Sequence, residues 1–436
     1  MEPIKIGIIG FGTVGAGTFE VLATNRDIIR DRVGAYVVVE KIADLDIKTD
    51  RGVHVDHKVL TVNALEVIED PEIKIVVELM GGVTKAKEYV IRAMEMGKHV
   101  VTANKALLAE HGHEIYTAAQ LHGVSLSFEA SVGGGIPIIG ALKSGLSANR
   151  IKLLMGILNG TSNYILTRMT KDGLSYDHVV EEAVELGIAE DPPTLDVDGT
   201  DAAHKLAILM SLLSGVPLDY GRIYKEGIDK LTPDDIRFAD EFGYRIKLLA
   251  IAKVLDDGLE MRVHPAMIPK DYILANVDEA FNAIYVEGDF VGPNLYYGLG
   301  AGRKPTGSAV VSDIMTLARH ISVGEKPFMP PLGHVHCRPN GVNIQPIDKL
   351  TSAYYFRVPA VDRPGVLSKI AGILGEHQIS ISSVIQKGRE VNGTVPVVML
   401  THEAKESSVR RAVSLIDDLD MVTDKTVMIR VERLKM

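Results

Sequence analysis

An aspartate and a lysine that stand four residues apart, Asp201 and Lys205, begin a long apolar segment. Residues four apart share one face of a helix, and Ile208 and Leu212 would continue the same stripe. No charged residue occurs from Leu206 to Leu218, which predicts that this helix is buried. Charges at the start of a buried helix are costly to desolvate unless they are paired or used. The spacing predicts either a structural ion pair or a lysine that carries protons beside a carboxylate.

A glycine-rich turn near the N-terminus has the spacing of a dinucleotide-binding site. Gly10, Gly12 and Gly15 follow the apolar run at residues 4–9 and lead into a predicted helix. Glycines so placed permit a tight turn and the close approach of a pyrophosphate. The free N–H groups at the start of the helix would bind the phosphates. A glycine turn without a ligand is the alternative.

The end of the second predicted strand carries Asp44, the candidate for the hydroxyl groups of the adenosine ribose. An ordinary turn residue is the alternative. No arginine directly follows this strand, which favours NAD(H). Lys41, Lys48 and Arg51 stand close enough to keep NADP(H) open.

Two further segments offer polar groups to a ligand. Lys105 follows a predicted strand, at the edge where open α/β sheets bind ligands, so it would meet an anionic group of substrate or cofactor. The alternative is a solvated lysine in the first turn of a helix. Residues 129–136 offer one carboxylate and several backbone carbonyls, which suits a hard cation with oxygen ligands, or form an ordinary glycine turn.

The histidines and the cysteine carry no convincing site. His54 and His57, like His111 and His113, lack a partner set of ligands, and we interpret them as surface or core residues. Cys337 is the single cysteine, which excludes a disulfide framework and fits a reducing cytoplasm. We interpret it as an unreactive thiol.

Composition excludes several classes of protein. A chain of 436 residues is too long for one core, so we expect two or three domains. The net charge of −10 argues against nucleic acid or an anionic membrane as the main partner. Neither a membrane-spanning run nor a signal peptide is recognisable. We therefore expect a cytoplasmic protein.

The first part of the chain alternates strand and helix patterns, which predicts a doubly wound parallel sheet of the Rossmann type. The expected strands are residues 4–9, 36–42, 74–79, 98–102 and 124–128. The expected helices run to Leu22, from Thr84 to Met96, and from a cap at Asn104 to Leu121. We expect this dinucleotide-binding domain to span residues 1–130.

The pattern changes after residue 130 into an α+β domain that would bind substrate and form a dimer, residues 131–321. Expected strands are residues 151–158, a hairpin of 245–255 with 259–264, and 283–287, with a helix at 306–321. Residues 322–352 contain five prolines and are interpreted as a linker.

Residues 353–436 are expected to form a third domain. Strands are predicted at 354–361, 379–386, 394–400 and 426–431, with a turn at 391–393. One helix opens at Asp362–Gly365, with Pro364 in its first turn, and another covers 404–418. The order β-α-β-β-α-β is the ferredoxin-like arrangement.

Seven motifs, in order, resemble those of homoserine dehydrogenase in the form with a C-terminal ACT domain, and the resemblance covers essentially the whole chain. They are Gly10-Phe11-Gly12-Thr13-Val14-Gly15, the segments 77–82, 101–105, 129–137 and 157–164, Asp201 to Lys205, and Gly300 to Gly302 with Pro305 and Thr306. Residues 361–367 and 379–384 look like an ACT domain.

The resemblance implies the interconversion of L-homoserine and L-aspartate 4-semialdehyde with NAD(H) or NADP(H), on the route to threonine and methionine. It implies that Lys205 is the acid/base at the substrate oxygen, that Asp201 and Glu190 bind the substrate, and that Lys105 assists. It also implies a monovalent cation, Na⁺ or K⁺, and further cofactor contacts. The cation residues are Glu129, Val132, Gly134 and Ile136, and the cofactor residues are the 10–15 turn, Asp44, Thr102, Lys105, Gly187 and Gly302.

The mechanism expected of this lysine follows from general acid–base chemistry. A general base works best with a pKa near the operating pH, about three units below that of a free lysine. Burial and a neighbouring cation lower a lysine pKa, and a neighbouring carboxylate raises it. We therefore expect Lys205 to carry the proton while Asp201 holds the substrate ammonium.

The chain departs from the family pattern at two places. The family usually has Glu-Ala-Asp-Pro where this chain has Glu190-Asp191-Pro192-Pro193, so the second acid is displaced by one residue. Arg303 and Lys304 stand where a glycine pair commonly precedes Pro-Thr, and two cations there could alter cofactor preference.

The ACT segment predicts feedback by an amino acid, expected to be threonine bound near Asp362–Gly365, in a homodimer or homotetramer. A pure oligomerisation module is the alternative. Two other functions compete with the whole interpretation. A semialdehyde dehydrogenase would need a catalytic cysteine in the substrate domain, and a silent sensor of NAD(P) and amino acids would not need Lys205 in a buried stripe.

Overall fold

The computed structural model describes residues 2–324, 329–335, 342–387 and 393–433. Cys337 and most of the predicted turn at 391–393 lie outside these ranges. The chain forms two compact units, each built from three separate segments. Unit 1 comprises Met1–Leu154, Asp201–Arg222 and Phe281–Val342, and unit 2 comprises Met155–Thr200, Ile223–Ala280 and Asn343–Met436.

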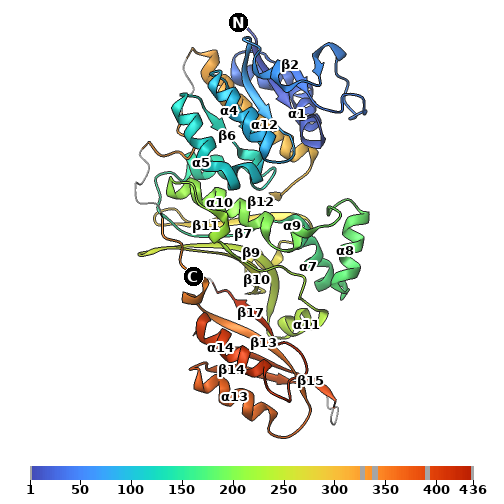
Figure 1. Ribbon diagram of the computed structural model, residues 1–436, viewed down its shortest axis with the longest axis vertical. Coiled ribbons are helices and arrows are strands. Elements are labelled where there is room, and N and C mark those ends of the chain that lie inside the picture. Colours follow the sequence, from blue (N-terminus) through green and yellow to red (C-terminus); the bar gives the residue numbers. More distant parts are fainter. Residues whose placement is uncertain (1, 325–328, 336–341, 388–392, 434–436) are drawn as a thin grey trace. The chain divides into compact units, whose positions relative to one another are not determined.

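Unit 1 contains the predicted doubly wound sheet (Figure 1). Its strands are β1 (Ile4–Ile9), β2 (Val37–Ala43), β3 (Leu60–Thr61), β4 (Ile73–Glu78), β5 (His99–Thr102) and β6 (Leu126–Ser127). They lie in the order β3-β2-β1-β4-β5-β6, and every neighbouring pair is parallel. The sequence missed β3, because two residues are too short for a recognisable pattern.

Three of the helices that connect these strands lie close to the predicted positions, namely α1 (Thr13–Thr24), α4 (Thr84–Glu95) and α5 (Lys105–Leu121). The short helices α2 (Arg26–Val33) and α3 (Ala64–Ile68) were not predicted. The predicted cap of α5 is confirmed, since the Asn104 side chain accepts a hydrogen bond from the backbone N–H of Leu107.

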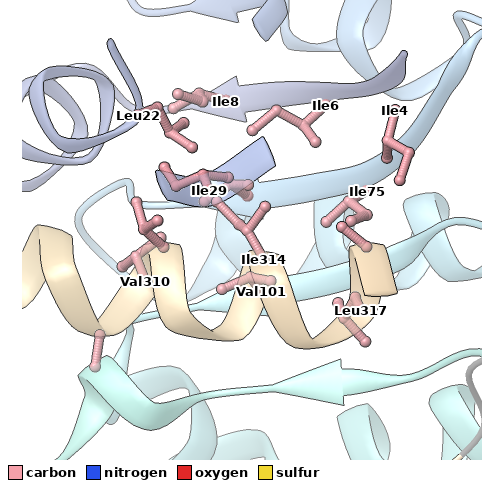
Figure 2. Packing of buried hydrophobic residues seen from close by; sticks show 14 of the residues in the cluster. Ile4, Ile6, Ile8, Leu22, Ile29, Ile75, Val101, Val310, Ile314 and Leu317 are labelled. Atoms are coloured by element: carbon pink, nitrogen blue, oxygen red, sulfur yellow. The ribbon is translucent and has the colours of Figure 1, made fainter. Parts of the chain in front are cut away.

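A helix from much later in the chain completes the core of this sheet. Figure 2 shows Val310 and Ile314 of α12 (Arg303–Ser322) turned toward the strands that carry Ile6, Ile8 and Ile75. A Cβ atom on Gly307 would lie 2.7 Å from the backbone carbon of Gly17 on α1, so the two helices cross in direct contact. The sequence grouped this helix with the substrate domain and did not predict that its apolar face packs in the core of the dinucleotide-binding sheet.

Unit 1 also holds an antiparallel hairpin of β11 (Phe281–Gly288) and β12 (Gly292–Leu299), of which the sequence predicted only the first strand. The remaining elements of the unit are α6 (Ile138–Gly140), a π-helical turn at Ala141–Gly145, and α10 (Thr200–Ser214), which begins at the boundary residue. Strand β7 (Ile151–Ile157) passes from unit 1 into unit 2.

Unit 2 is built on a sheet with the order β9-β10-β17-β13-β15-β14. The predicted hairpin is confirmed as β9 (Tyr244–Leu255) and β10 (Gly258–Pro269). Its helices and short strands are α7 (Gly160–Asp172), α8 (Tyr176–Glu185), α9 (Thr194–Val197), α11 (Pro233–Glu241), β8 (Tyr224–Lys225) and β16 (Ala404–Lys405).

The predicted β-α-β-β-α-β order of the C-terminal region is confirmed. It consists of β13 (Thr351–Val361), α13 (Val366–Glu376), β14 (Ile381–Gln386), β15 (Thr394–Thr401), α14 (Glu406–Asp417) and β17 (Val427–Val431). These elements enclose a hydrophobic core of their own. The first helix begins after Gly365, whose φ of 94° ends the preceding turn, so Pro364 precedes the helix instead of lying in its first turn.

This region is not separate from the rest of unit 2. Strand β17 pairs in parallel with β10, with Ala266 opposite Arg430 and Met267 opposite Val431. The sheet therefore continues from the substrate region into the C-terminal region. No helix in the described ranges is long and apolar enough to cross a membrane.

Candidate active site

The start of helix α10 brings three charged side chains of unit 1 together. Lys205 Nζ lies 2.7 Å from Asp201 Oδ2, and Lys105 Nζ lies 2.6 Å from Asp201 Oδ1. Asp201 and Lys205 are buried, whereas the Lys105 side chain is 45% exposed. The predicted pairing of Asp201 with Lys205 is confirmed. The resemblance implied that Lys105 assists at this site, but its direct contact with Asp201 was not predicted, because that lysine comes from a different helix.

The electrostatics of this triad fix the charge of the aspartate. Burial alone would raise the pKa of the Asp201 carboxyl, but the attraction of Lys205 and Lys105 outweighs it and holds the pKa well below its usual value. Asp201 is therefore ionised at any pH at which the protein works. The carboxylate has a cation at each oxygen, and the more exposed of the two, Lys105, is the one that can also meet an anionic group.

The packing of α10 fixes the positions of its charged side chains. Alpha10 is buried on all sides, as the absence of charge from Leu206 onward predicts. Its fully buried residues include Ala202, Ala203, Leu206, Ala207 and Leu209. His204 is buried too, with its ring edge-on to Tyr220 at a centroid distance of 4.5 Å. A helix locked in this way keeps Asp201 and Lys205 in one geometry.

The glycine turn after β1 has the shape that a dinucleotide requires. A Cβ atom on Gly10 would lie 2.5 Å from the Leu79 backbone, and one on Gly15 would lie 2.3 Å from the Gly10 carbonyl oxygen. Gly12 instead faces open space, and no side chain caps α1 there. The free N–H groups of α1 thus face an open cradle beside Gly12, which fits a pyrophosphate.

Asp44 lies beside this turn, at the end of β2. Its carboxylate accepts hydrogen bonds from the Phe11 N–H and, at 2.8 Å, from the Asp46 N–H. A cavity of about 270 Å³ adjoins it, lined in part by Lys48, Arg51 and His54. Asp44 and two of the three cations expected to distinguish NAD(H) from NADP(H), Lys48 and Arg51, therefore line one cavity. Lys41 does not line it, and its ammonium lies 3.8 Å from the carboxylates of Glu66 and Asp70.

The two cations that depart from the family pattern are engaged near this cavity. Arg303 Nη1 donates to the Arg51 carbonyl oxygen at 2.8 Å, and its Nε lies 3.1 Å from Glu20. Lys304 is 75% exposed and lies 3.3 Å from the same glutamate. Arg303 thus braces the loop that carries Arg51, whereas Lys304 stays at the surface.

Two predicted cofactor residues lie at the edges of this region. The Thr102 side chain is fully buried and donates its hydroxyl to Glu78, so its hydroxyl is already engaged. Gly302 has a φ of 118° and caps α12 without a side chain. Glu78 was missed by the sequence reasoning, although it lies within the 77–82 motif at the end of a strand.

The segment proposed for the cation forms a tight irregular turn. Glu129 is buried, and its carboxylate accepts the N–H groups of Ile139 and Gly140 at 2.8 and 2.7 Å. A Cβ atom on Gly134 would lie 2.5 Å from the Gly300 carbonyl oxygen, so only glycine fits there. No group of three or more His, Cys, Asp and Glu side chains suited to a metal ion occurs among the described residues. A site here would depend on carbonyl oxygens with one carboxylate.

A second carboxyl group lies against this turn. Asp313 Oδ2 accepts the Glu129 N–H at 2.8 Å, and burial together with the Glu129 charge raises the pKa of Asp313 to about 8. Burial also raises the pKa of Glu129. The charge of Lys143 acts to lower both pKa values, so this side chain already supplies one positive charge beside the proposed donor set.

In unit 2, Gly187 and Glu190 belong to the loop between α8 and α9, which the start of α7 anchors. Thr161 Oγ1 donates to the Ile188 carbonyl oxygen at 2.9 Å, and Ser162 Oγ donates to that of Asp196 at 2.6 Å. Asn159 Nδ2 donates to Asp196 Oδ1 at 2.8 Å. These side chains belong to the 157–164 motif, whose role the sequence left open.

The acids of this loop have different surroundings. Asp198 accepts the Thr200 N–H and hydroxyl, each at 2.8 Å, so it caps the start of α10. Glu190 and the displaced Asp191 are exposed, and Gly187 has a φ of 68°. The carboxylates of Asp196 and Asp198 are thus hydrogen-bonded within the protein, while Glu190 and Asp191 face solvent.

The chain matches three family models, and each covers one part of the sequence. They are "Homoserine dehydrogenase, NAD binding domain" at residues 10–129, "Homoserine dehydrogenase" at 137–315 and "ACT domain" at 354–420. A homoserine dehydrogenase of Pseudomonas aeruginosa is 47% identical over 440 residues, covering all of both chains.

Solved structures similar to this chain are also homoserine dehydrogenases. A homoserine dehydrogenase from Thiobacillus denitrificans superposes with a TM-score of 0.93 at 46% identity, covering 99% of each chain. A hyperthermophilic archaeal homoserine dehydrogenase in complex with NADPH matches 72% of this chain and 97% of its own, with a TM-score of 0.62 and 29% identity.

Proposed function

Because the chain belongs to the homoserine dehydrogenase family, and is therefore an NAD(P)-dependent oxidoreductase, we propose that Lys205 carries the proton in its reaction. A bound nicotinamide cofactor would supply the hydride acceptor or donor for the carbon that bears the oxygen. In the oxidation of L-homoserine, the amine of Lys205 takes the hydroxyl proton. In the reduction of L-aspartate 4-semialdehyde, its ammonium returns a proton to the oxygen.

One observation carries this proposal: the triad of Lys105, Asp201 and Lys205 at the start of a buried helix. Asp201 keeps Lys205 in place and offers a permanent negative charge to the substrate ammonium. Glu190 contributes to substrate binding, as the family resemblance implies. Lys105 meets an anionic group of the substrate or cofactor, since its side chain is the most exposed of the three.

The separation of roles is tested by comparing Asp201→Asn with Lys205→Met, with homoserine oxidation followed by absorbance of the reduced cofactor. Asp201→Asn is expected to raise the KM for homoserine by about tenfold or more, because the charge that binds the ammonium is lost. Lys205→Met is expected to act on kcat instead. An unchanged KM in Asp201→Asn would remove its assignment to the substrate.

For the cofactor, we propose that Asp44 binds the hydroxyl groups of the adenosine ribose. We further propose that Lys48 and Arg51 donate hydrogen bonds to a 2′-phosphate when NADP(H) is bound. The archaeal homoserine dehydrogenase was solved in complex with NADPH, which supports NADP(H) as one possible cofactor. Arg51 Nη2 lies 3.1 Å from Asp46 Oδ2, so the carboxylate competes with a phosphate for this arginine. Asp46→Asn is therefore expected to raise kcat/KM for NADP⁺ by about tenfold while leaving that for NAD⁺ nearly unchanged. Equal changes for both cofactors would oppose this assignment.

We propose a monovalent cation, Na⁺ or K⁺, bound by the Glu129 carboxylate and the carbonyl oxygens of Val132, Gly134 and Ile136. Such an ion would stabilise the turn that Gly134 packs against Gly300. Its binding is expected to raise the melting temperature in NaCl or KCl relative to tetramethylammonium chloride at equal ionic strength. Glu129→Gln should abolish that difference, and persistence of the difference would place the ion elsewhere.

For the ACT region, we propose feedback by an amino acid, with threonine bound near Asp362–Gly365, in a homodimer or homotetramer of this enzyme. Deleting this region is an unsuitable test, because β17 is paired to β10. Inhibition of the full chain by threonine, and its loss in Asp362→Ala, tests the proposal. An enzyme insensitive to threonine and related amino acids would leave the region a role in assembly only.

We place the enzyme in the cytoplasm, because a single cysteine suits a reducing compartment.

A further inference from the structure

A buried glutamate outside the triad lies at the end of strand β4. Glu78 is fully buried and stands opposite Thr102 in the parallel register of β4 with β5. Its Oε2 accepts the Thr102 hydroxyl at 2.5 Å, and its Oε1 accepts the Met80 N–H at 2.9 Å. The carboxylate thus joins the ends of two neighbouring strands at the edge where this type of sheet binds ligands.

The same network continues into the start of α5. The Asn104 N–H donates to the Thr102 hydroxyl oxygen at 3.0 Å, and Asn104 Nδ2 donates to the Gly82 carbonyl oxygen at 2.8 Å. Asn104 Oδ1 accepts the Leu107 N–H and so caps the helix whose first residue is Lys105. The backbone of Lys105 is therefore fixed through Asn104 and Thr102 by the glutamate.

We propose that Glu78 is a positioning residue that sets the place of Lys105 in the active site. Lys105 reaches Asp201 from the first turn of α5, so a shift of that turn moves the ammonium relative to the triad. The inference rests on the proposed role of Lys105. Glu78 itself touches neither Lys105 nor Asp201 in the described hydrogen bonds and acts through the two residues between.

Energetics support a functional purpose for this carboxyl group. Burial raises the pKa of Glu78 to about 7, so the fold holds an acid where an apolar residue would be less costly. A carboxylate there accepts hydrogen bonds from the Met80 N–H and the Thr102 hydroxyl at once. A glutamine offers one acceptor oxygen and brings an N–H₂ group that opposes these donors, so Glu78→Gln disturbs the network at nearly constant volume.

A double-mutant cycle between Glu78→Gln and Lys105→Ala tests the proposal. The readouts are kcat/KM for homoserine and the affinity for homoserine of the enzyme bound to reduced cofactor, a complex that cannot react. Glu78→Gln is expected to lower both by about tenfold when Lys105 is present and by less than about twofold in Lys105→Ala, because coupled residues are not additive. Val76→Ala, fully buried on the same strand and apolar, is the control for general damage and should act equally in both backgrounds.

Equal losses from Glu78→Gln in both backgrounds, or no loss at all, would overturn the proposal and leave Glu78 a structural residue. If Lys105→Ala alone changes neither readout, the proposed role of Lys105 fails instead, and the two failures are distinguishable. If Glu78→Gln does not fold, the same cycle is carried out with Thr102→Val, which removes the hydroxyl that joins Glu78 to the Asn104 N–H. Thr102→Ser restores the hydroxyl and is expected to recover most of the loss.

Discussion

The charged residues of this active site are held by partners that lie far from them in sequence. Asp201 and Lys205 stand four apart on one helix, and their pairing was predictable from that spacing alone. Lys105 joins them from 96 residues earlier (201 − 105) at 2.6 Å. Glu78 is linked to Lys105 only through Thr102 and Asn104. The sequence marked it as part of the 77–82 motif but did not indicate its partners. Local periodicity thus predicts contacts within a helix, whereas contacts between helices depend on tertiary packing.

Glu78 predicts a specific dependence of stability on pH. Its pKa is raised by burial from 4.5 to about 7 in the folded protein, so the folded state binds the proton more tightly than the unfolded state. The stability that this group contributes is complete below about pH 4.5 and is lost as the pH rises through about 7.

Glu78→Gln removes this dependence. The free energy of unfolding of the variant minus that of the native protein is expected to rise by up to about 3 kcal/mol between about pH 4.5 and 8. Urea unfolding at a series of pH values measures the difference. Glu110→Gln, on the exposed side of α5, is the control for the loss of a carboxyl group at the surface. A flat difference for Glu78→Gln would mean that its carboxyl is not perturbed.

At the scale of elements, helix α7 organises the loop that carries Glu190. Asn159, Thr161 and Ser162 at its N-terminus bind the backbone or side chain of residues 188 and 196, which flank the proposed substrate glutamate. The motif 157–164 was visible in the sequence, but its function was not, since these hydrogen bonds span 27 to 37 residues.

Removal of one anchor should therefore weaken substrate binding without stopping the chemistry. Ser162→Ala loses the hydrogen bond to the Asp196 carbonyl oxygen, and the KM for homoserine is expected to rise about fivefold with kcat nearly unchanged. Thr170→Val is the matched control, since the Thr170 hydroxyl bonds to Leu166 within the same helix. Steady-state kinetics that show equal effects for both variants would attribute the change to the helix as a whole.

Over the whole chain, the sequence predicted which types of fold occur more accurately than which segments of the chain build each of them. The parallel sheet and the β-α-β-β-α-β region both follow from local patterns and were confirmed. The return of α12 to the first sheet was not predictable, because an apolar helix face does not identify its partner. The pairing of β17 with β10 was missed for a similar reason, since the two strands lie more than 150 residues apart (427 − 269 = 158).

Buried ion pairs join the C-terminal region to the rest of unit 2. Arg430 is fully buried and contacts Glu406 of α14 at 2.5 Å and Glu226 at 2.8 Å. Burial acts to raise the pKa of Glu406, but the hydrogen bond and charge of Arg430 lower it below its ordinary value. The ACT region thus shares a charged core with the segment that follows α10.

Arg430→Met should destabilise the protein strongly, because it leaves two carboxylates without their central partner. The free energy of unfolding is expected to fall by about 3–5 kcal/mol. Arg410→Met is the control, since Arg410 contacts the same Glu406 at 2.8 Å but is 40% exposed, and it should cost less than about 1 kcal/mol. Chemical denaturation of both variants decides, and similar losses would contradict a special role for the buried arginine.

The central claim is that Lys205 carries the proton, and the turnover of Lys205→Met measured with its cofactor affinity tests it most directly. Methionine has nearly the same length, fits a buried helix and leaves Asp201 with Lys105 as a partner. The kcat for homoserine oxidation is expected to fall by roughly 10³-fold, as the loss of a general base requires, with the cofactor Kd changed by less than about twofold. A variant that keeps its turnover while binding cofactor normally would contradict the account.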